Sequence, residues 1–190
     1  MSKAYDVIII ITGIIGCCIA YEISKKGYHT LNIDFQPAAG GGSTAISCGN
    51  VRFYYSTHDG VATAYERAWY WHNWQKYINV RDPRGVAGFH NTGSVFIKNQ
   101  VIDWPKVKTN FDRVGVKYEE WDLPTLQNKI PVANFRSFYP PRRPEDPNFL
   151  EESNKWLEGA CYTPESGYVG DPQLATQNVE CVARAKGAEF

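Results

Sequence analysis

Apolar and polar positions in the N-terminal part of the chain follow the pattern of a β-α-β unit. Val7–Ile11 is an uninterrupted, largely β-branched run of strand length, which is typical of a parallel strand covered on both faces. After a short turn, Ile15, Ile19 and Ile23 recur at every fourth position and predict a helix with one buried stripe. Thr30–Asp34 is again strand-like, so strand, helix and strand follow one another as in a β-α-β unit.

The rest of the chain alternates between further helices, strands and one proline-rich connection. The segment Pro131–Pro147 is expected to be a loop that connects two lobes. The other expected elements, in order, are a helix over Val61–Ile78, strands over Gly93–Lys98 and Val116–Glu119, a short helix from Leu123, and a hairpin of Ala160–Tyr162 with Tyr168–Val169.

A final helix is predicted after Asp171, which is a favourable N-cap residue, with Pro172 in the first helical position. The segment after this helix, Lys186–Phe190, repeats the order of Lys26–Thr30, in which a helix ends at a glycine and a strand begins. We therefore expect a further core strand to begin at the last residues of the sequence. The expected apolar stripe of the final helix consists of Leu174, Cys181, Val182 and Ala185.

The turn between the first strand and the first helix carries part of a dinucleotide-binding fingerprint. That fingerprint uses one glycine for the tight turn, a second for close approach to the pyrophosphate, and a third for helix–sheet packing. Gly13 and Gly16 occupy the second and third places, but Ile11 occupies the first. Asp34 closes the second strand, where an acidic side chain accepts hydrogen bonds from the adenosine ribose. The alternative is a generic α/β unit with a chance pair of glycines.

Composition describes an ordinary globular protein and indicates no nucleic-acid partner, because 20 basic residues are balanced by 20 acidic ones. The uncharged run Val7–Ala20 is too short to span a bilayer. A lipoprotein export signal with its cleavage box at Ile14–Cys17 is a poorer interpretation, because Asp6 precedes the run and an amphipathic helix continues it. The five cysteines show neither metal-ligand spacing nor a disulfide framework, so we expect no metal site and a reducing, cytoplasmic location.

The loop after Asp34 resembles the flavin-contacting segment of a known family. The stretch Gly42–Ser56, GSTAISCGNVRFYYS, is similar to that segment in the D-amino-acid oxidase superfamily, especially in its sarcosine oxidase and dimethylglycine oxidase branch. Further resemblance lies at Tyr5–Ile9, Asn91–Val95 and Gly167–Pro172, in the order of the family. The similar segments extend along nearly the whole chain, yet they correspond only to about the first half of a family member.

The resemblance implies an α/β fold with a Rossmann-like, doubly wound FAD-binding domain and part of an α+β substrate domain. Residues 1–60 would begin the FAD-binding domain, residues 61–170 would form the substrate-domain portion and its connections, and residues 171–190 would be a helix returning to the FAD-binding domain. Arg52 would lie near the isoalloxazine, where a positive charge stabilises the anionic reduced flavin. The residues implied to bind FAD are Gly13, Gly16, Asp34, Ser43, Thr44, Ser47 and Arg52.

The implied activity is oxidation of the C–N bond of a small amine or N-methylated amino acid, such as sarcosine or dimethylglycine, to an imine. No catalytic residue is assigned, because His58, His72 and His90 are equally consistent with packed or solvated histidines. Two alternatives stay open: a non-catalytic or degenerate subunit of the FAD fold, and a nicotinamide-binding domain. The expected partners are a small amine substrate and an oligomer mate or companion polypeptide that completes the fold, with no membrane.

Overall fold

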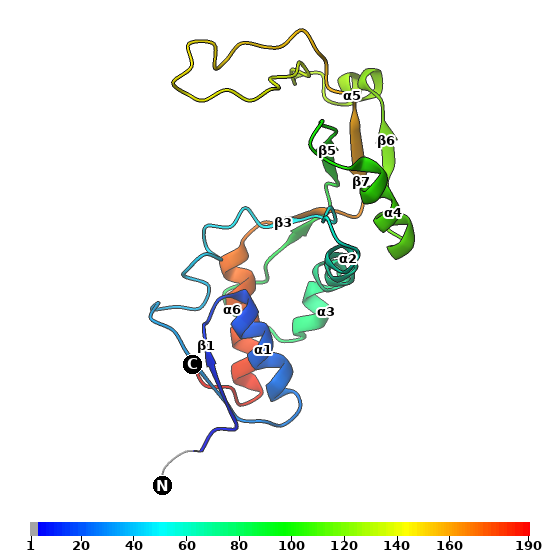
Figure 1. Cartoon of the computed structure of the whole chain (residues 1–190). Helices are drawn as coiled ribbons and strands as arrows, with labels where there is room; N and C mark the ends of the chain where they lie inside the picture. The colour runs from blue at the N-terminus through cyan, green and yellow to red at the C-terminus, as the bar shows by residue number, and fades with distance from the viewer. Residues whose placement is uncertain (1–3) are drawn as a thin grey trace. The chain divides into compact units, whose positions relative to one another are not determined.

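The computed structural model describes residues 4–190, which form two compact units (Figure 1). The first unit comprises the chain up to Val51 together with Glu66–Asn91 and Gly167–Phe190, and the second comprises Arg52–Tyr65 and Thr92–Ser166. Both units contain helices and strands, which confirms the predicted α/β class. None of the described helices has the length and apolar character needed to cross a bilayer.

The β-α-β unit predicted from the apolar pattern is present in the first unit. β1 (Val7–Ile10) and β2 (Thr30–Ile33) pair in parallel, and α1 (Ile14–Ser24) connects them. Glu189 bridges to β2, also in parallel, and its carbonyl accepts a hydrogen bond from the N–H of Asn32 at 2.7 Å. The expected further strand therefore begins beside β2.

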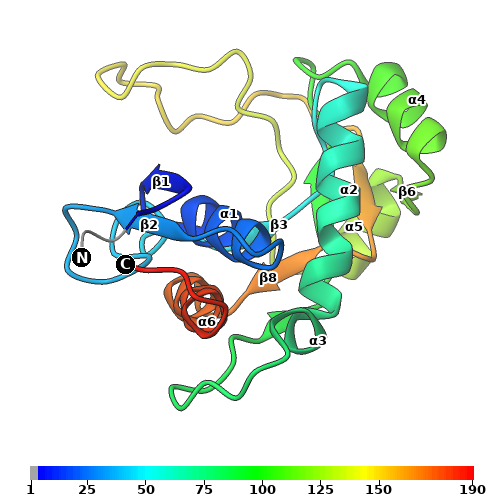
Figure 2. The ribbon, with the colours of Figure 1, turned by 90° about the horizontal axis from the view of Figure 1, so that it is seen from below.

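Helix α6 (Pro172–Ala185) packs beside α1 in the first unit, as Figures 1 and 2 both show. Its N-cap is the predicted one, because Asp171 Oδ1 accepts a hydrogen bond from the N–H of Leu174 at 2.8 Å. Directly before α6, β8 (Gly167–Val169) pairs antiparallel with two short strands. These strands are β3 (Asn50–Val51) and β4 (Phe89–His90).

The helix predicted over residues 61–78 is two helices, α2 (His58–His72) and α3 (Trp74–Ile78), which are separated at Asn73. The Asn73 amide donates a hydrogen bond to the carbonyl of Trp69 at 2.8 Å. The Asn73 side chain thus binds a backbone carbonyl of the last turn of α2, and such side-chain bonds compete with continuation of a helix.

The second unit contains a three-stranded antiparallel sheet with β7 (Ala160–Thr163) between β5 (Ser94–Ile97) and β6 (Glu119–Trp121). It also contains α4 (Trp104–Val114) and α5 (Leu123–Lys129). Residues 131–159 form no helix and no extended strand, consistent with the predicted connection. Part of the core of this unit consists of Trp121, Leu126, Phe135 and Ala160.

The buried faces of α1 and α6 differ from the predicted ones, although Val182 of the predicted α6 stripe is buried. In α1, Ile15 and Ile19 are 65% and 42% exposed, and the buried residues are small or aromatic. Small residues allow two helix backbones to approach closely, which suits the packing of α1 against α6. The buried residues are Gly16, Cys17, Ala20, Tyr21 and Ser24 in α1, and Ala175, Thr176, Asn178, Val179, Val182 and Ala183 in α6.

The predicted coverage of the first strand on both faces is also wrong for the described residues. Ile9 is buried, whereas Ile8 and Ile10 are 59% and 78% exposed, so only one face of β1 is covered. The alternation follows from the pleat, which points successive side chains to opposite faces of the sheet.

Other differences concern strand pairing and one helix. The predicted hairpin is wrong, because β7 and β8 belong to different sheets. The strand predicted over Val116–Glu119 lies later than expected, at β6 (Glu119–Trp121). Helix α4 was not predicted, although Asp103 caps it by accepting from the N–H of Lys106 at 3.1 Å and Pro105 follows in its first turn.

Candidate dinucleotide-binding site

The turn between β1 and α1 presents a helix N-terminus to its surroundings. Gly13 is the N-cap of α1, and its carbonyl accepts the first helical hydrogen bond, from the N–H of Cys17 at 3.0 Å. The N–H groups of the first helical turn therefore have no acceptor within the helix, and the helix dipole is positive at this end. The N–H of Ile14 donates to Thr44 Oγ1 at 3.3 Å. Such a helix start is suited to binding a pyrophosphate.

Close packing in this turn requires glycine at position 16. A Cβ atom at Gly16 would lie 2.3 Å from the carbonyl oxygen of Ile11, which is too close for any side chain. Ile11 itself, in the place of the first fingerprint glycine, does not need a positive φ. Among the described non-glycine residues, only Asn79 has one. The turn therefore forms without a positive φ at Ile11, and Ile11 is 46% exposed.

Asp34 lies directly after β2 and holds the turn in place. Its Oδ2 accepts hydrogen bonds from the N–H of Thr12 at 2.7 Å and from the Thr12 hydroxyl at 3.0 Å. Its Oδ1 accepts from the N–H of Gln36 at 3.0 Å. The N–H groups of Gln36 and Thr12 lower the pKa of Asp34 below its ordinary value, so the side chain is a carboxylate at neutral pH.

The carboxylate of Asp34 keeps capacity for a ligand. A carboxylate offers about four acceptor positions, and these protein contacts use both positions of Oδ2 but only one of Oδ1. The remaining position on Oδ1 could accept a hydrogen bond from one ribose hydroxyl.

A hollow of about 310 Å³ lies beside Asp34, and we call it the Asp34 hollow. On one side it is lined by the end of β2 and the loop that follows, and on the other by Glu180 and Arg184 of α6 and by Phe190. It adjoins the turn through Thr12.

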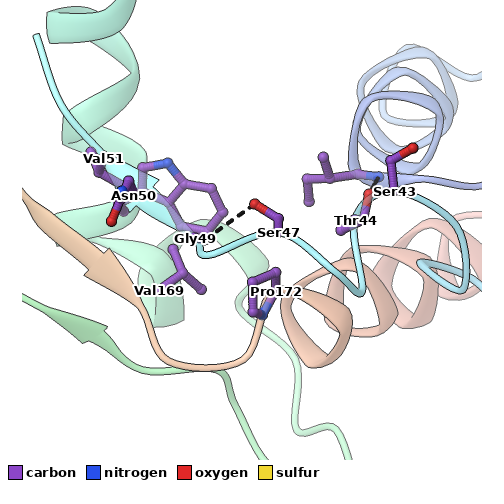
Figure 3. Close-up of a pocket in the computed structure, with 10 residues that line it drawn as sticks. Ser43, Thr44, Ser47, Gly49, Asn50, Val51, Val169 and Pro172 are labelled. Atoms are coloured by element: carbon purple, nitrogen blue, oxygen red, sulfur yellow. Dashed lines mark hydrogen bonds between the residues drawn. The ribbon is translucent and has the colours of Figure 1, made fainter. Parts of the chain in front are cut away.

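A second hollow, of about 290 Å³, adjoins the same turn through Ile14, and we call it the Thr44 hollow (Figure 3). Figure 3 shows the loop with Ser43, Thr44 and Ser47 along one side and Pro172, at the start of α6, near Ser47. Ser47 Oγ accepts a hydrogen bond from the N–H of Gly49 at 3.1 Å and so shapes the end of this loop.

Six of the seven sequence-predicted residues gather in the first unit. Ser43, Thr44 and Ser47 line the Thr44 hollow, and Asp34 lines the other. Gly13 lies in the turn, and Gly16 lies at the start of α1. Arg52 belongs to the second unit, where its guanidinium lies 5.4 Å from the ring centroid of Tyr55. The function of all seven residues stays a prediction.

A family model described as FAD dependent oxidoreductase (DAO) matches residues 6–190. The chain belongs to this family. FAD is accordingly its cofactor, and the recognition of the D-amino-acid oxidase superfamily from the loop sequence is confirmed at this level. The comparisons do not single out the sarcosine oxidase branch. A search of the curated proteins gives no match.

Solved structures of this superfamily share the fold. L-proline dehydrogenase from P. horikoshii is 19% identical with a TM-score of 0.73, and 100% of this chain covers 44% of that one. Glycine oxidase from Geobacillus kaustophilus is 18% identical with a TM-score of 0.72, over 98% of this chain and 46% of that one. Iminodiacetate oxidase from Chelativorans sp. BNC1 is 18% identical with a TM-score of 0.60, over 96% and 45%. The chain thus spans less than half the length of these three proteins.

The residues of the first unit fit FAD. A dinucleotide needs donors for its pyrophosphate and an acceptor for its ribose, and the start of α1 and Asp34 provide these groups. Hollows adjoin the turn through Thr12 and through Ile14, so room for a ligand exists next to both groups. The replacement of the first glycine by Ile11 leaves this arrangement intact.

Several residues of the site were not found from the sequence. Thr12 donates two hydrogen bonds to Asp34, and Arg184 and Glu180 line the Asp34 hollow. The spacing of Glu180 and Arg184 could have indicated an ion pair on a helix, but it carries no information about proximity to Asp34.

The two adjacent cysteines of α1 are not suited to thiolate chemistry. Burial raises the pKa of the Cys17 and Cys18 thiols to about 12, which disfavours the reactive thiolate. Within residues 4–190, no group of His, Cys, Asp and Glu side chains is arranged to hold a metal ion.

Proposed function

We propose that this chain binds FAD as part of an oxidoreductase that converts the C–N bond of a small amine or N-methylated amino acid to an imine. The observation that carries the proposal is the placement of Asp34, the start of α1 and the Ser43–Ser47 loop around one turn of a chain from an FAD-dependent family. FAD, when bound, would supply the hydride-accepting chemistry.

The first unit would hold the cofactor by three kinds of contact. Asp34 would accept a hydrogen bond from the adenosine ribose, and the first-turn N–H groups after Gly13 would bind the pyrophosphate. The hydroxyls of Ser43, Thr44 and Ser47 would donate to the pyrophosphate or the ribityl chain. Arg52, which follows β3, would carry a positive charge near the isoalloxazine; this role rests on the sequence resemblance.

The substrate class is proposed from two sources. The segment Gly42–Ser56 resembles the sarcosine and dimethylglycine oxidase branch, whose substrates are N-methylated amino acids. The names of the structural neighbours include proline, glycine and iminodiacetate, which are small amino acids or secondary amines. Both sources favour a small amine that carries a carboxylate.

The proposed division into domains rests on the sequence resemblance. We assign FAD binding to residues 1–60 and 171–190, and the substrate-domain portion to residues 61–170. The remainder of the FAD site and the substrate pocket would come from a C-terminal continuation or a companion polypeptide.

The alternative is a degenerate, non-catalytic subunit of the same fold, and Ile11 in the place of the first glycine is the observation that favours it. An absorbance scan of the purified protein separates the two proposals. Flavin bands that persist through gel filtration support the proposed function, whereas a protein that stays colourless after incubation with FAD supports the degenerate subunit.

A matched pair of variants makes this scan specific to the site. Thr44→Val removes the hydroxyl beside the N–H of Ile14, and it should lower flavin content. Thr63→Val makes the same change at an exposed position of α2 and should leave flavin content unaltered. Peroxide production and dye reduction with sarcosine, dimethylglycine, proline and glycine then test the substrate class.

A further inference from the structure

A series of ion pairs links Asp82 and Arg84 to two charged residues of α6, Glu180 and Arg184. Asp82, whose side chain is 2% exposed, accepts from Arg84 Nε at 3.0 Å. Arg84 Nη1 lies 3.8 Å from Glu180 Oε2, and Glu180 Oε1 accepts from Arg184 Nε at 2.8 Å. The charge of Glu180, 14% exposed, is therefore balanced by an arginine on each side.

The end of this series of ion pairs is positioned to meet a ligand. Arg184 and Asp34 both line the Asp34 hollow. Glu180 engages Arg184 through Nε, and among the described residues the two terminal nitrogens of Arg184 form no hydrogen bond. The guanidinium lies 4.8 Å from the ring centroid of Phe190, so an aromatic ring supports it. The Arg184 side chain is still 48% exposed and accessible from the hollow.

We propose that Arg184 binds the adenosine diphosphate half of FAD and that Glu180 is the residue that positions it. The inference rests on the proposed function, because it uses Asp34 as the ribose contact. A guanidinium is planar and always charged, so it can stack on adenine, donate to its ring nitrogens and attract the anionic diphosphate. The flavin mononucleotide half carries no adenosine and would not contact this residue.

Ligand selectivity tests the proposal, independently of turnover. Apoprotein of the full 190-residue chain, in whatever state of association it adopts, is titrated calorimetrically with FAD, ADP and FMN. Arg184→Met should weaken binding of FAD and ADP by roughly tenfold, the size expected for loss of a charged hydrogen-bonding partner. It should leave FMN binding unchanged. Arg184→Lys, which keeps the charge but not the plane, should give a smaller loss.

Glu180→Gln and a remote control separate positioning from folding. Glu180→Gln keeps an acceptor for Arg184 but removes the charge, and it should weaken ADP binding while leaving FMN binding unaltered. Arg113→Met, an equivalent change at an exposed position of α4, should have no effect.

Three outcomes would overturn the inference. Wild-type ADP affinity in both Arg184 variants would show that Arg184 makes no contact. Equal weakening of all three ligands would show a general structural effect. A wild-type chain that binds neither FAD nor ADP would contradict the proposed function itself, and the inference with it. Thermal unfolding without ligand identifies any variant that fails to fold.

Discussion

At the residue scale, the two oxygens of the Asp34 carboxylate differ in their protein contacts, and we propose that they differ in function. Oδ2 accepts two hydrogen bonds from Thr12, whereas Oδ1 accepts one from the N–H of Gln36 and is the oxygen that we propose for the ribose contact. Because the hydroxyl of Thr12 is one of the donors, a residue between the fingerprint positions takes part in orienting the acidic side chain.

Replacing Asp34 should therefore affect the cofactor and the turn to different degrees. Asp34→Asn keeps an acceptor at one atom and should weaken FAD binding less than Asp34→Ala, for which we expect roughly a tenfold loss. Fluorescence titration of the apoprotein with FAD measures both. Asp146→Ala, in the other unit, is the control. An unchanged FAD dissociation constant in Asp34→Ala would contradict the proposed ribose contact.

Ile11 provides the second prediction at this scale. It is bulkier than the glycine of the fingerprint, and we expect its β-branched side chain to occupy space beside the proposed pyrophosphate site. Ile11→Gly should tighten FAD binding, measured by the same titration, whereas Val132→Gly at an exposed position of the second unit should not. Equal or weaker binding by Ile11→Gly would mean that this turn holds its ligand differently from the glycine-bearing fingerprint.

The positions of site residues were predictable where they follow from nearby sequence, and were not where they depend on contacts between distant segments. Asp34 and Gly16 stand at fixed spacings from a strand and a helix, so their positions follow from the β-α-β pattern. Arg184 reaches the Asp34 hollow only because α6 packs beside α1, and no spacing encodes that packing.

At the element scale, α6 is anchored by a buried asparagine. Asn178 is fully buried; its amide donates to Asp82 Oδ2 at 2.9 Å and to the carbonyl of Gly85 at 2.8 Å. Its side-chain oxygen accepts from the N–H of Ala87 at 2.9 Å. One side chain thus satisfies three groups of the segment that leads into β4.

Asn178→Ala should lower the free energy of unfolding by about 3 kcal/mol, because buried partners lose their hydrogen bonds. Urea denaturation followed by circular dichroism measures this change. Gln177→Ala, the neighbouring and less buried position, should stay within about 0.5 kcal/mol of the wild type. A loss below about 1 kcal/mol in Asn178→Ala would show that water replaces the amide.

Helix positions were predicted better than helix faces. The N-cap at Asp171 is local and appears as expected, and Gly27, just after the end of α1, has a left-handed φ of 88°. The isoleucines of α1 suggested the buried stripe, but the face packed on α6 is the one with Cys17 and Ala20. Side-chain size, rather than hydrophobicity alone, therefore explains which face of α1 packs against α6.

At the scale of the whole molecule, several isoleucines of the β-α-β unit lie outside the core. Ile8, Ile10, Ile15 and Ile33 are all at least 46% exposed, and they lie on β1, α1 and β2. Among the described strands, β1 pairs only with β2, so its other edge is open. Exposed apolar groups and open strand edges promote association with another chain.

We therefore expect the 190-residue chain alone to dimerise or aggregate rather than form a stable, catalytically active monomer. Sedimentation velocity measures its mass, and flavin content and sarcosine-dependent peroxide production measure its activity. Ile10→Lys should reduce association, whereas Ile46→Lys, similarly exposed but in the loop, should not. A monodisperse, yellow monomer with turnover would contradict this expectation.

The chain passes between the two units at Val51, Tyr65, Asn91 and Ser166. No continuous stretch of the gene therefore encodes either unit, and a truncated chain that ends anywhere before residue 167 leaves the first unit without α6. During synthesis, β1, α1 and β2 leave the ribosome long before α6, which covers the small-residue face of α1. Until α6 has been synthesised, the small-residue face of α1 stays uncovered in the nascent chain, and we expect chaperones to bind there.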